Sequence, residues 1–174
     1  MTPQAADVLV IAASNGENLK LAERFAAEAR SQGQSAAVLD LTLLELPLFT
    51  PQARASLHPP ALAALEALLR GSARWVICSP EYNGSIPPVL TSATAWLTVQ
   101  GKDFRALFNG RPIVIASHSG SGGHTVMVAL RLQLAHLGAV VVGRQSVSIA
   151  DTPAKEATIS DLITRLIALP APPA

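Results

Sequence analysis

This sequence has little charge, a single cysteine and no long apolar run, and each shortage excludes a class of protein. Only 14% of its 174 residues are charged, and the formal net charge is +1. The chain therefore lacks the positive surface that attracts nucleic acids and anionic membranes. Cys78 is the one cysteine, which excludes an internal disulfide and leaves no CxxC pair to bind a metal.

The amino-terminal segment offers no signal for export or membrane insertion. Residues 1–7 contain no lysine or arginine, the apolar run after them is short, and no apolar stretch approaches the roughly 18 residues of a membrane span. A lone cysteine also suits a reducing compartment. We therefore expect a cytoplasmic protein without nucleic-acid or membrane partners.

Short β-branched runs alternate with segments of helical periodicity along the whole chain. The run after Asp7, VLVIA, is apolar at consecutive positions, as in strands that are buried on both faces of a parallel sheet. Between Leu19 and Arg30 the apolar residues instead recur every three or four positions, as on one face of a helix. The alternation predicts strands over 7–13, 36–41, 75–78, 111–117 and 140–142, helices over 19–30, 61–70, 88–100 and 125–137, and a last helix with Thr152 as its cap and Pro153 as its first residue.

Five strands and five helices in alternation, without repeats or a linker, predict one α/β domain. We assign residues 1–169 to this domain and residues 170–174 to a flexible tail. Right-handed crossovers would cover both faces of a parallel sheet and give a three-layer, doubly wound architecture. With five strands the leading order is the flavodoxin-like 2-1-3-4-5, in which ligands bind at the carboxyl ends of the first and third strands.

The first loop at that edge, residues 13–18, carries groups that suit a phosphate. Ser14, Asn15 and Asn18 offer a hydroxyl and two amides beside the free N–H groups of a helix start. A helix cap formed by Ser14 or Asn15 would explain these residues without a ligand. The carboxylate of Glu17 opposes anion binding.

The second loop, residues 79–88, has the sequence SPEYNGSIPP. Tyr and Asn in such a turn suit the recognition of a flat heterocycle, and Gly84 allows a close backbone approach, although a plain turn before a helix would use the same residues. The run PEYNGSIP, followed by Leu90 and by Ala-Trp-Leu at 95–97, resembles the signature of the NAD(P)H-dependent FMN reductases. That family includes quinone, chromate and azo-dye reductases of flavodoxin-like fold.

The resemblance implies FMN as cofactor and NADH or NADPH as electron donor. In the family the FMN phosphate lies in the first loop, and backbone groups of the second and third loops hold the isoalloxazine ring. Residues 117–123 stand in the place of the third, glycine-rich loop. Carried over residue by residue, this implies phosphate contacts from Ser14, Asn15 and Asn18 and ring contacts from Pro80, Glu81, Tyr82, Asn83, Gly84, Ser117 and Gly120.

The implied reaction passes hydride from NAD(P)H to flavin N5 and then reduces a quinone, free flavin, azo compound or metal oxyanion by a ping-pong mechanism. No residue has to act as acid or base, because the flavin carries the chemistry. The family's paired helices also imply a homodimer or homotetramer. The first loop departs from the family pattern: it is about three residues shorter, has Ala13 at a glycine position and lacks an arginine, so we expect looser FMN binding.

Other functions on the same fold remain as alternatives. A flavodoxin-type electron carrier would bind FMN without oxidising NAD(P)H, and a degenerate family member would have weak or lost FMN binding. A signalling receiver needs acidic residues where this chain has Ala12-Ala13 and Cys78-Ser79. Residues 117–124, SHSGSGGH, lack the lysine of a P-loop and the last glycine of a dinucleotide fingerprint. The two histidines of that loop have poor metal-ligand spacing, and we expect no metal.

Overall fold

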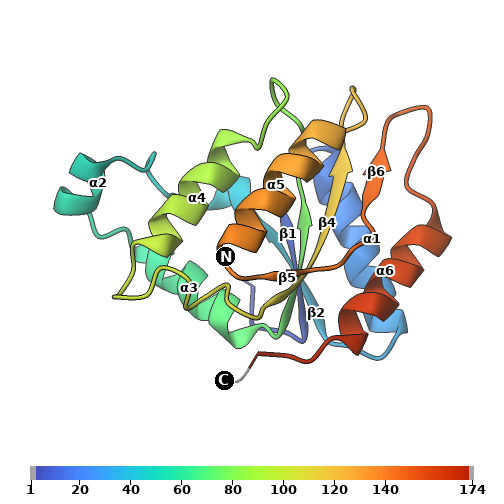
Figure 1. Ribbon diagram of the computed structural model, residues 1–174, viewed down its shortest axis with the longest axis horizontal. Coiled ribbons are helices and arrows are strands. Elements are labelled where there is room, and N and C mark those ends of the chain that lie inside the picture. Colours follow the sequence, from blue (N-terminus) through green and yellow to red (C-terminus); the bar gives the residue numbers. More distant parts are fainter. Residues whose placement is uncertain (1–2, 173–174) are drawn as a thin grey trace.

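The computed structural model describes residues 3–172, in which strands and helices alternate along the chain (Figure 1). Met1, Thr2, Pro173 and Ala174 lie outside the described residues, and so does the end of the predicted 170–174 tail. The strands are β1 Val8–Ala12, β2 Ala36–Asp40, β3 Arg74–Cys78, β4 Pro112–His118, β5 Val140–Val141 and β6 Ser146–Ser148. The helices are α1 Glu17–Ser31, α2 Pro51–Ser56, α3 Pro60–Gly71, α4 Pro88–Thr98, α5 His124–His136 and α6 Glu156–Ala168, with a 3-10 turn η1 at Leu41–Leu43.

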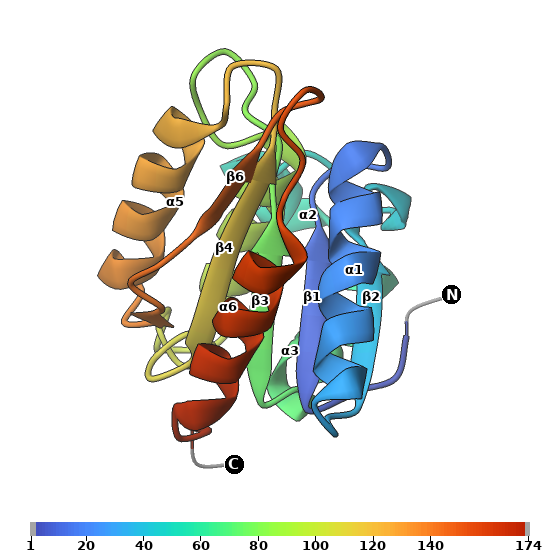
Figure 2. The same ribbon diagram turned by 90° about the vertical axis from the view of Figure 1, so that its right-hand side faces the viewer.

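The sheet is parallel and its order, β2-β1-β3-β4-β5, confirms the prediction. Ala12 at the end of β1 lies opposite both Asp40 and Cys78, and Cys78 lies opposite Ala116 of β4. These strands therefore end close together, and the loops that follow β1, β3 and β4 emerge at one edge, at the top of Figures 1 and 2.

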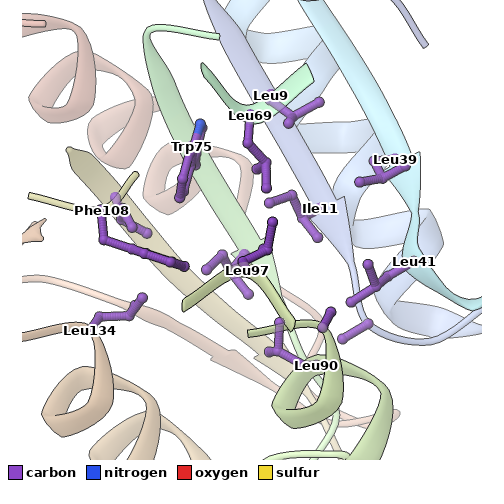
Figure 3. Packing of buried hydrophobic residues seen from close by; sticks show 14 of the residues in the cluster. Leu9, Ile11, Leu39, Leu41, Leu69, Trp75, Leu90, Leu97, Phe108 and Leu134 are labelled. Carbon is purple, nitrogen blue, oxygen red and sulfur yellow. The ribbon is translucent and has the colours of Figure 1, made fainter. Parts of the chain in front are cut away.

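Helices cover both faces of the sheet and give the predicted three layers. The helices α3, α4 and α5 lie on one face and α1 and α6 on the other (Figures 1 and 2). Successive strand side chains point to opposite faces, so Leu9 and Ile11 join one core while Val8 and Val10 join the other. Figure 3 looks into the core beneath α3, α4 and α5. This two-sided burial is why β1 is apolar at every position.

The structure corrects the predicted carboxyl-terminal third. The fifth strand is split, because Ser146 is six positions beyond Val140, whereas their β4 partners, Ala116 and Pro112, are only four positions apart. Two extra residues thus interrupt the pairing and leave β6 as a separate strand beside β4. The predicted helix start at Thr152 and Pro153 is wrong. Both the N–H and the carbonyl of Thr152 pair with Ile149 in a tight turn, and α6 begins only at Glu156, after the cap residue Lys155.

The long connection after β2 contains a helix that the sequence analysis missed. The helix α2 begins at Pro51, and the hydroxyl of Thr50 caps it by accepting a hydrogen bond of 2.9 Å from the N–H of Ala53. A Thr-Pro pair at a helix start is a recognisable signal, but α2 is only 6 residues long, too short to show periodicity. Within residues 3–172 no helix is both long and apolar enough to cross a membrane.

Candidate functional site

Three loops meet at the carboxyl edge of the sheet, and main-chain hydrogen bonds fasten their first residues together. The N–H of Ala13 donates to the carbonyl of Cys78 at 2.9 Å, and that of Ser79 donates to Ala116 at 2.9 Å. The N–H of Ser119 donates to Ser148 at 3.0 Å. The loops at 13–16, 79–87 and 119–123 therefore lie side by side at the edge where the strand order predicts a ligand.

The first loop presents a row of unused backbone donors at the start of α1. Gly16 occupies the cap position, and no side chain caps the helix. Across residues 3–172 the N–H groups of residues 14 to 18 find no acceptor. The alternative in which Ser14 or Asn15 serves only as a cap therefore fails. At an uncapped helix start the consecutive free N–H groups point outward as donors, and the helix dipole adds partial positive charge. Both features favour an anion.

Asn18 has a different position from the one expected of a phosphate ligand. Its side chain is only 2% exposed. The amide nitrogen donates to the carbonyl of His118 at 2.9 Å, and the amide oxygen accepts from the N–H of His118 at 2.9 Å. The same nitrogen also donates to the hydroxyl oxygen of Ser14 at 3.4 Å, which leaves the hydroxyl hydrogen of Ser14 free for an acceptor. The side chain of Asn18 thus fastens the first loop to β4. The main-chain N–H of Asn18 remains one of the free donors at the start of α1.

Glu17 lies beside the free donors, and its negative charge is paired with a neighbouring lysine. Its carboxylate pairs with Lys20 one turn further along α1, at 2.6 Å, and both side chains are exposed. The hydrogen bond and the charge of Lys20 lower the pKa of Glu17. The negative charge that the sequence places against an anion is therefore partly compensated by its neighbour.

The second loop is a two-residue hairpin. Tyr82 and Ser85 exchange two main-chain hydrogen bonds of 3.0 and 3.1 Å around Asn83 and Gly84. The φ angles of these two residues are 51° and 70°, which is the type I′ turn that Asn-Gly favours. A Cβ on Gly84 would meet only a Thr125 methyl carbon at 4.0 Å. The positive φ of the backbone therefore favours glycine here, whether or not a ring approaches it closely as the sequence predicts.

The third loop packs closely against the end of β4. The hydroxyls of Ser117 and Ser119 are 3.0 Å apart in a buried pair, and the N–H of Glu81 donates to Ser119 at 2.6 Å. Gly123 has a φ of +71°, and a Cβ there would collide with the side chain of Ser117. Ser117 is therefore a buried support for the loop, whereas Gly120 is exposed on it.

Two hollows and one buried cysteine lie near the second loop. A depression of about 520 Å³ lies against Glu81, Tyr82, Asn83, Ile86 and Pro88. Pro88 also borders a groove of about 250 Å³, whose other walls are Leu41, Leu44, Leu46, Leu48, Val89, Ser92 and Ala93. Cys78 ends β3 nearby, but it is fully buried, and burial raises the pKa of its thiol far above the ordinary value. It has no thiolate to offer as a nucleophile or ligand.

Comparison with known proteins settles the family. The NADPH-dependent FMN reductase family matches residues 6–154. The chain belongs to this family. It is an NAD(P)H-dependent flavin reductase, with FMN as cofactor and NADH or NADPH as electron donor. No curated protein gives a significant match.

Solved structures agree with the fold of this FMN reductase. An oxidoreductase from Corynebacterium diphtheriae superposes with a TM-score of 0.72 at 21% identity, over 96% of this chain and 97% of its own. The flavoenzyme NAD(P)H:(acceptor) oxidoreductase FerB from Paracoccus denitrificans gives 0.70 at 21% identity, over 93% of both chains. A flavodoxin from the domain Archaea gives 0.63 at 12% identity, over 92% of this chain and 98% of its own. At these identities the likeness establishes the flavodoxin-like fold.

The free donors at this edge fit FMN. The phosphate would find the N–H groups of residues 14 to 18, and a flat ring with carbonyl oxygens would find further donors in the other two loops. Within the described residues 3–172, the N–H groups of Asn83, Gly84, Gly120 and Ser121 also have no acceptor. Such exposed backbone donors are the groups that the family resemblance predicts against the ring.

The sequence analysis missed the residues that join the loops. It named Glu81 as a ring contact, but not its partners Ser119, Ser121 and Val126. It also missed that Asn18 binds His118, which is 100 residues further along the chain. The sequence shows the serines of the third loop. Their hydrogen-bond partners lie in other loops, so they depend on the register of the strands in the sheet.

Proposed function

We propose that this flavin reductase binds FMN across the three loops, oxidises NADH or NADPH, and passes the electrons to a small organic acceptor. The observation that carries the proposal is the row of free N–H groups at residues 14 to 18, beside the family's ring-binding loop. In this arrangement a phosphate needs no arginine, because helix N-terminal N–H groups bind it without one.

Each predicted site residue has a role that its surroundings support. Ser14 donates its hydroxyl hydrogen, and Asn15 its exposed side chain, to the phosphate. Asn18 contributes its N–H while its amide holds the loop in place. Pro80, Tyr82, Asn83 and Gly84 frame the ring from the second loop, which Glu81 joins to the third, and Ser117 and Gly120 shape and present the third.

The protein's contribution is binding and access rather than acid or base chemistry. FMN, when bound, accepts hydride from the nicotinamide and delivers electrons through N5. The chain leaves Tyr82 and Asn83 exposed at the rim of the depression, so donor and acceptor would reach the same side in turn.

The lining of the neighbouring groove favours an apolar acceptor. Leucines and Val89 supply most of it, and no charged side chain contributes. The one hydroxyl, on Ser92, is already used, because it accepts from the N–H of Phe49 at 2.9 Å. Such a surface suits a quinone ring and offers a metal oxyanion nothing. We therefore rank quinones above oxyanions among the family's acceptors.

Steady-state kinetics test this function. With FMN-loaded protein, NAD(P)H oxidation should depend on a quinone, and double-reciprocal plots at several quinone concentrations should give parallel lines. Kcat/KM should be higher for quinone than for chromate. A protein that binds FMN but does not oxidise NAD(P)H would instead be an electron carrier, and one that binds no FMN would be a degenerate family member. Intersecting lines would exclude the proposal that donor and acceptor use the same side of the flavin in turn.

We also propose that two copies assemble through α5. Val128 and Leu132 lie one turn apart on this helix and are 69% and 72% exposed. Two neighbouring large apolar side chains so open to solvent are typical of an interface. A homodimer, or a dimer of dimers, would cover them.

A further inference from the structure

The helix α5 begins at the flavin edge without a cap of its own. Its cap position is Gly123, which has no side chain and a left-handed backbone, with φ +71°. The first turn of the helix therefore needs an acceptor from elsewhere. Glu81, in the second loop, supplies it: its carboxylate oxygen Oε2 accepts a hydrogen bond of 3.0 Å from the N–H of Val126.

Glu81 makes two more contacts with the third loop. Its other carboxylate oxygen, Oε1, accepts from the hydroxyl of Ser121 at 2.7 Å, and its own N–H donates to the hydroxyl of Ser119 at 2.6 Å. One residue thus binds the third loop at its beginning and middle and also binds the helix that follows it. Both oxygens of the carboxylate accept a hydrogen bond from the protein, and an ionised carboxylate has no hydrogen to donate to a flavin carbonyl.

The carboxylate suits this position electrostatically. A helix N-terminus carries partial positive charge, and hydrogen bonds to an ionised acceptor are stronger than neutral ones. The hydrogen bonds from Ser121 and Val126 lower the pKa of Glu81, which keeps it ionised at neutral pH. The family motif thus contains an acidic residue beside a cofactor that is itself anionic, and the helix end offsets that charge.

From this geometry we propose that Glu81 is a positioning residue, which clamps the two ring-binding loops together, and not a flavin ligand. The inference rests on the proposed function. The clamp holds the free donors of Asn83, Gly84, Gly120 and Ser121 in their binding arrangement before the flavin arrives. Its loss should therefore weaken binding of the ring and leave the phosphate contacts at α1 unchanged.

The test compares FMN with riboflavin, which has the ring but no phosphate, in apoprotein titrations. Glu81→Ala should weaken both flavins by the same factor, on the order of tenfold, which corresponds to about 1.4 kcal/mol. Glu81→Gln should recover most of the affinity, because an amide can accept from Val126 through its oxygen and donate to Ser121 through its nitrogen. Ser121→Ala removes one partner only and should give a smaller, equally shared loss.

Glu66→Ala is the matched control. Glu66 also has a bonded carboxylate, 2.7 Å from Arg70, but it lies on α3, away from the flavin loops. This variant should bind both flavins as the unaltered protein does. The inference would be overturned if Glu81→Ala bound both flavins as tightly as the unaltered protein does, or if it lost affinity for FMN alone. It would also be overturned if Glu81→Gln bound the flavins as weakly as Glu81→Ala.

Hydrogen exchange of the apoprotein gives a reading that does not depend on flavin. The amide of Val126 should exchange faster in Glu81→Ala and, to a lesser degree, in Ser121→Ala, and it should keep its rate in Glu66→Ala. Unchanged exchange in both clamp variants would overturn the clamp. If the unaltered protein binds no flavin, the proposed function fails, and the exchange rates still decide whether the clamp exists.

Discussion

The side chain of Asn18 and the main chain of His118 exchange two hydrogen bonds of 2.9 Å each, although 100 residues separate them. The pair joins the first turn of α1 to the last residue of β4. It holds the first loop, where we propose that the phosphate binds, against the third loop. Glu81 makes the corresponding connection between the second and third loops. All three loops are thus joined through side chains rather than by the sheet alone.

Replacing Asn18 by Ala should destabilise the apoprotein as well as weaken FMN. The substitution leaves a partly buried N–H and carbonyl of His118 without partners, at a cost of roughly 2–3 kcal/mol. For a chain of this size the midpoint of thermal unfolding should fall by roughly 5–10 °C. Thermal unfolding followed by circular dichroism measures this. Asn15→Ala, which removes an exposed side chain on the same loop, should leave the midpoint unchanged. An unchanged midpoint in Asn18→Ala would refute the structural role.

Gly84→Val should abolish tight flavin binding. The type I′ turn requires φ near +70° at this position, and a β-branched side chain adopts that conformation only at considerable cost. The hairpin should open and the donors of the second loop should disperse. Flavin content after reconstitution measures the effect. Gly143→Val is the control, because Gly143 has neither positive φ nor a neighbour within 4 Å of an added Cβ. Full occupancy in Gly84→Val would show that this loop does not hold the ring.

The strands and their order were predictable, because β1, β3 and β4 are apolar runs that only two-sided burial explains. Those strands in turn located the three loops. The local sequence could not reveal the split fifth strand, because the interruption is defined by its register against β4. It also gave the wrong start for α6, since Thr152 is held in a turn with Ile149 that the Thr-Pro pattern does not distinguish from a cap.

The same limit applied to the site. The motif at 80–87 predicted Glu81 beside the flavin by its resemblance to the family, and the order of the strands placed its loop at the expected edge. Its role as the cap of α5 depends on Gly123, which leaves that helix start without a side-chain acceptor. Asn18 was expected at the phosphate for its amide, yet the amide is used by His118. Hydrogen bonds between side chains of different loops depend on how the loops lie against one another in the folded chain. The spacing of residues in one sequence does not predict this.

Glu17→Gln should tighten FMN modestly and leave riboflavin unchanged. The carboxylate repels the phosphate at the start of α1, but its pairing with Lys20 at 2.6 Å and its exposure limit the gain to less than about fivefold. The gain should shrink as salt is added. Lys20→Gln, which removes the compensating charge, should weaken FMN and again spare riboflavin. Titrations at low and high salt measure both, and equal responses of the two flavins would place the phosphate elsewhere.

Val128→Glu should dissociate the proposed dimer. The side chain is 69% exposed on α5, so a charge there does not disturb the core but opposes burial against a second copy. Light scattering at micromolar concentration should report a dimer or tetramer for the unaltered protein and a monomer for the variant. Thr164→Glu, on an exposed position of α6, is the control and should leave assembly intact. A monomeric unaltered protein would contradict the proposal.

The most direct test of the account is to locate FMN on the protein. Isotope-labelled apoprotein should be titrated with FMN and the backbone amide resonances followed by NMR. The account predicts that the largest shifts fall at residues 14–18, 81–85 and 119–123, and that riboflavin reproduces the last two sets but not the first. Shifts centred on another edge of the sheet, or an equal effect of riboflavin at residues 14–18, would contradict it.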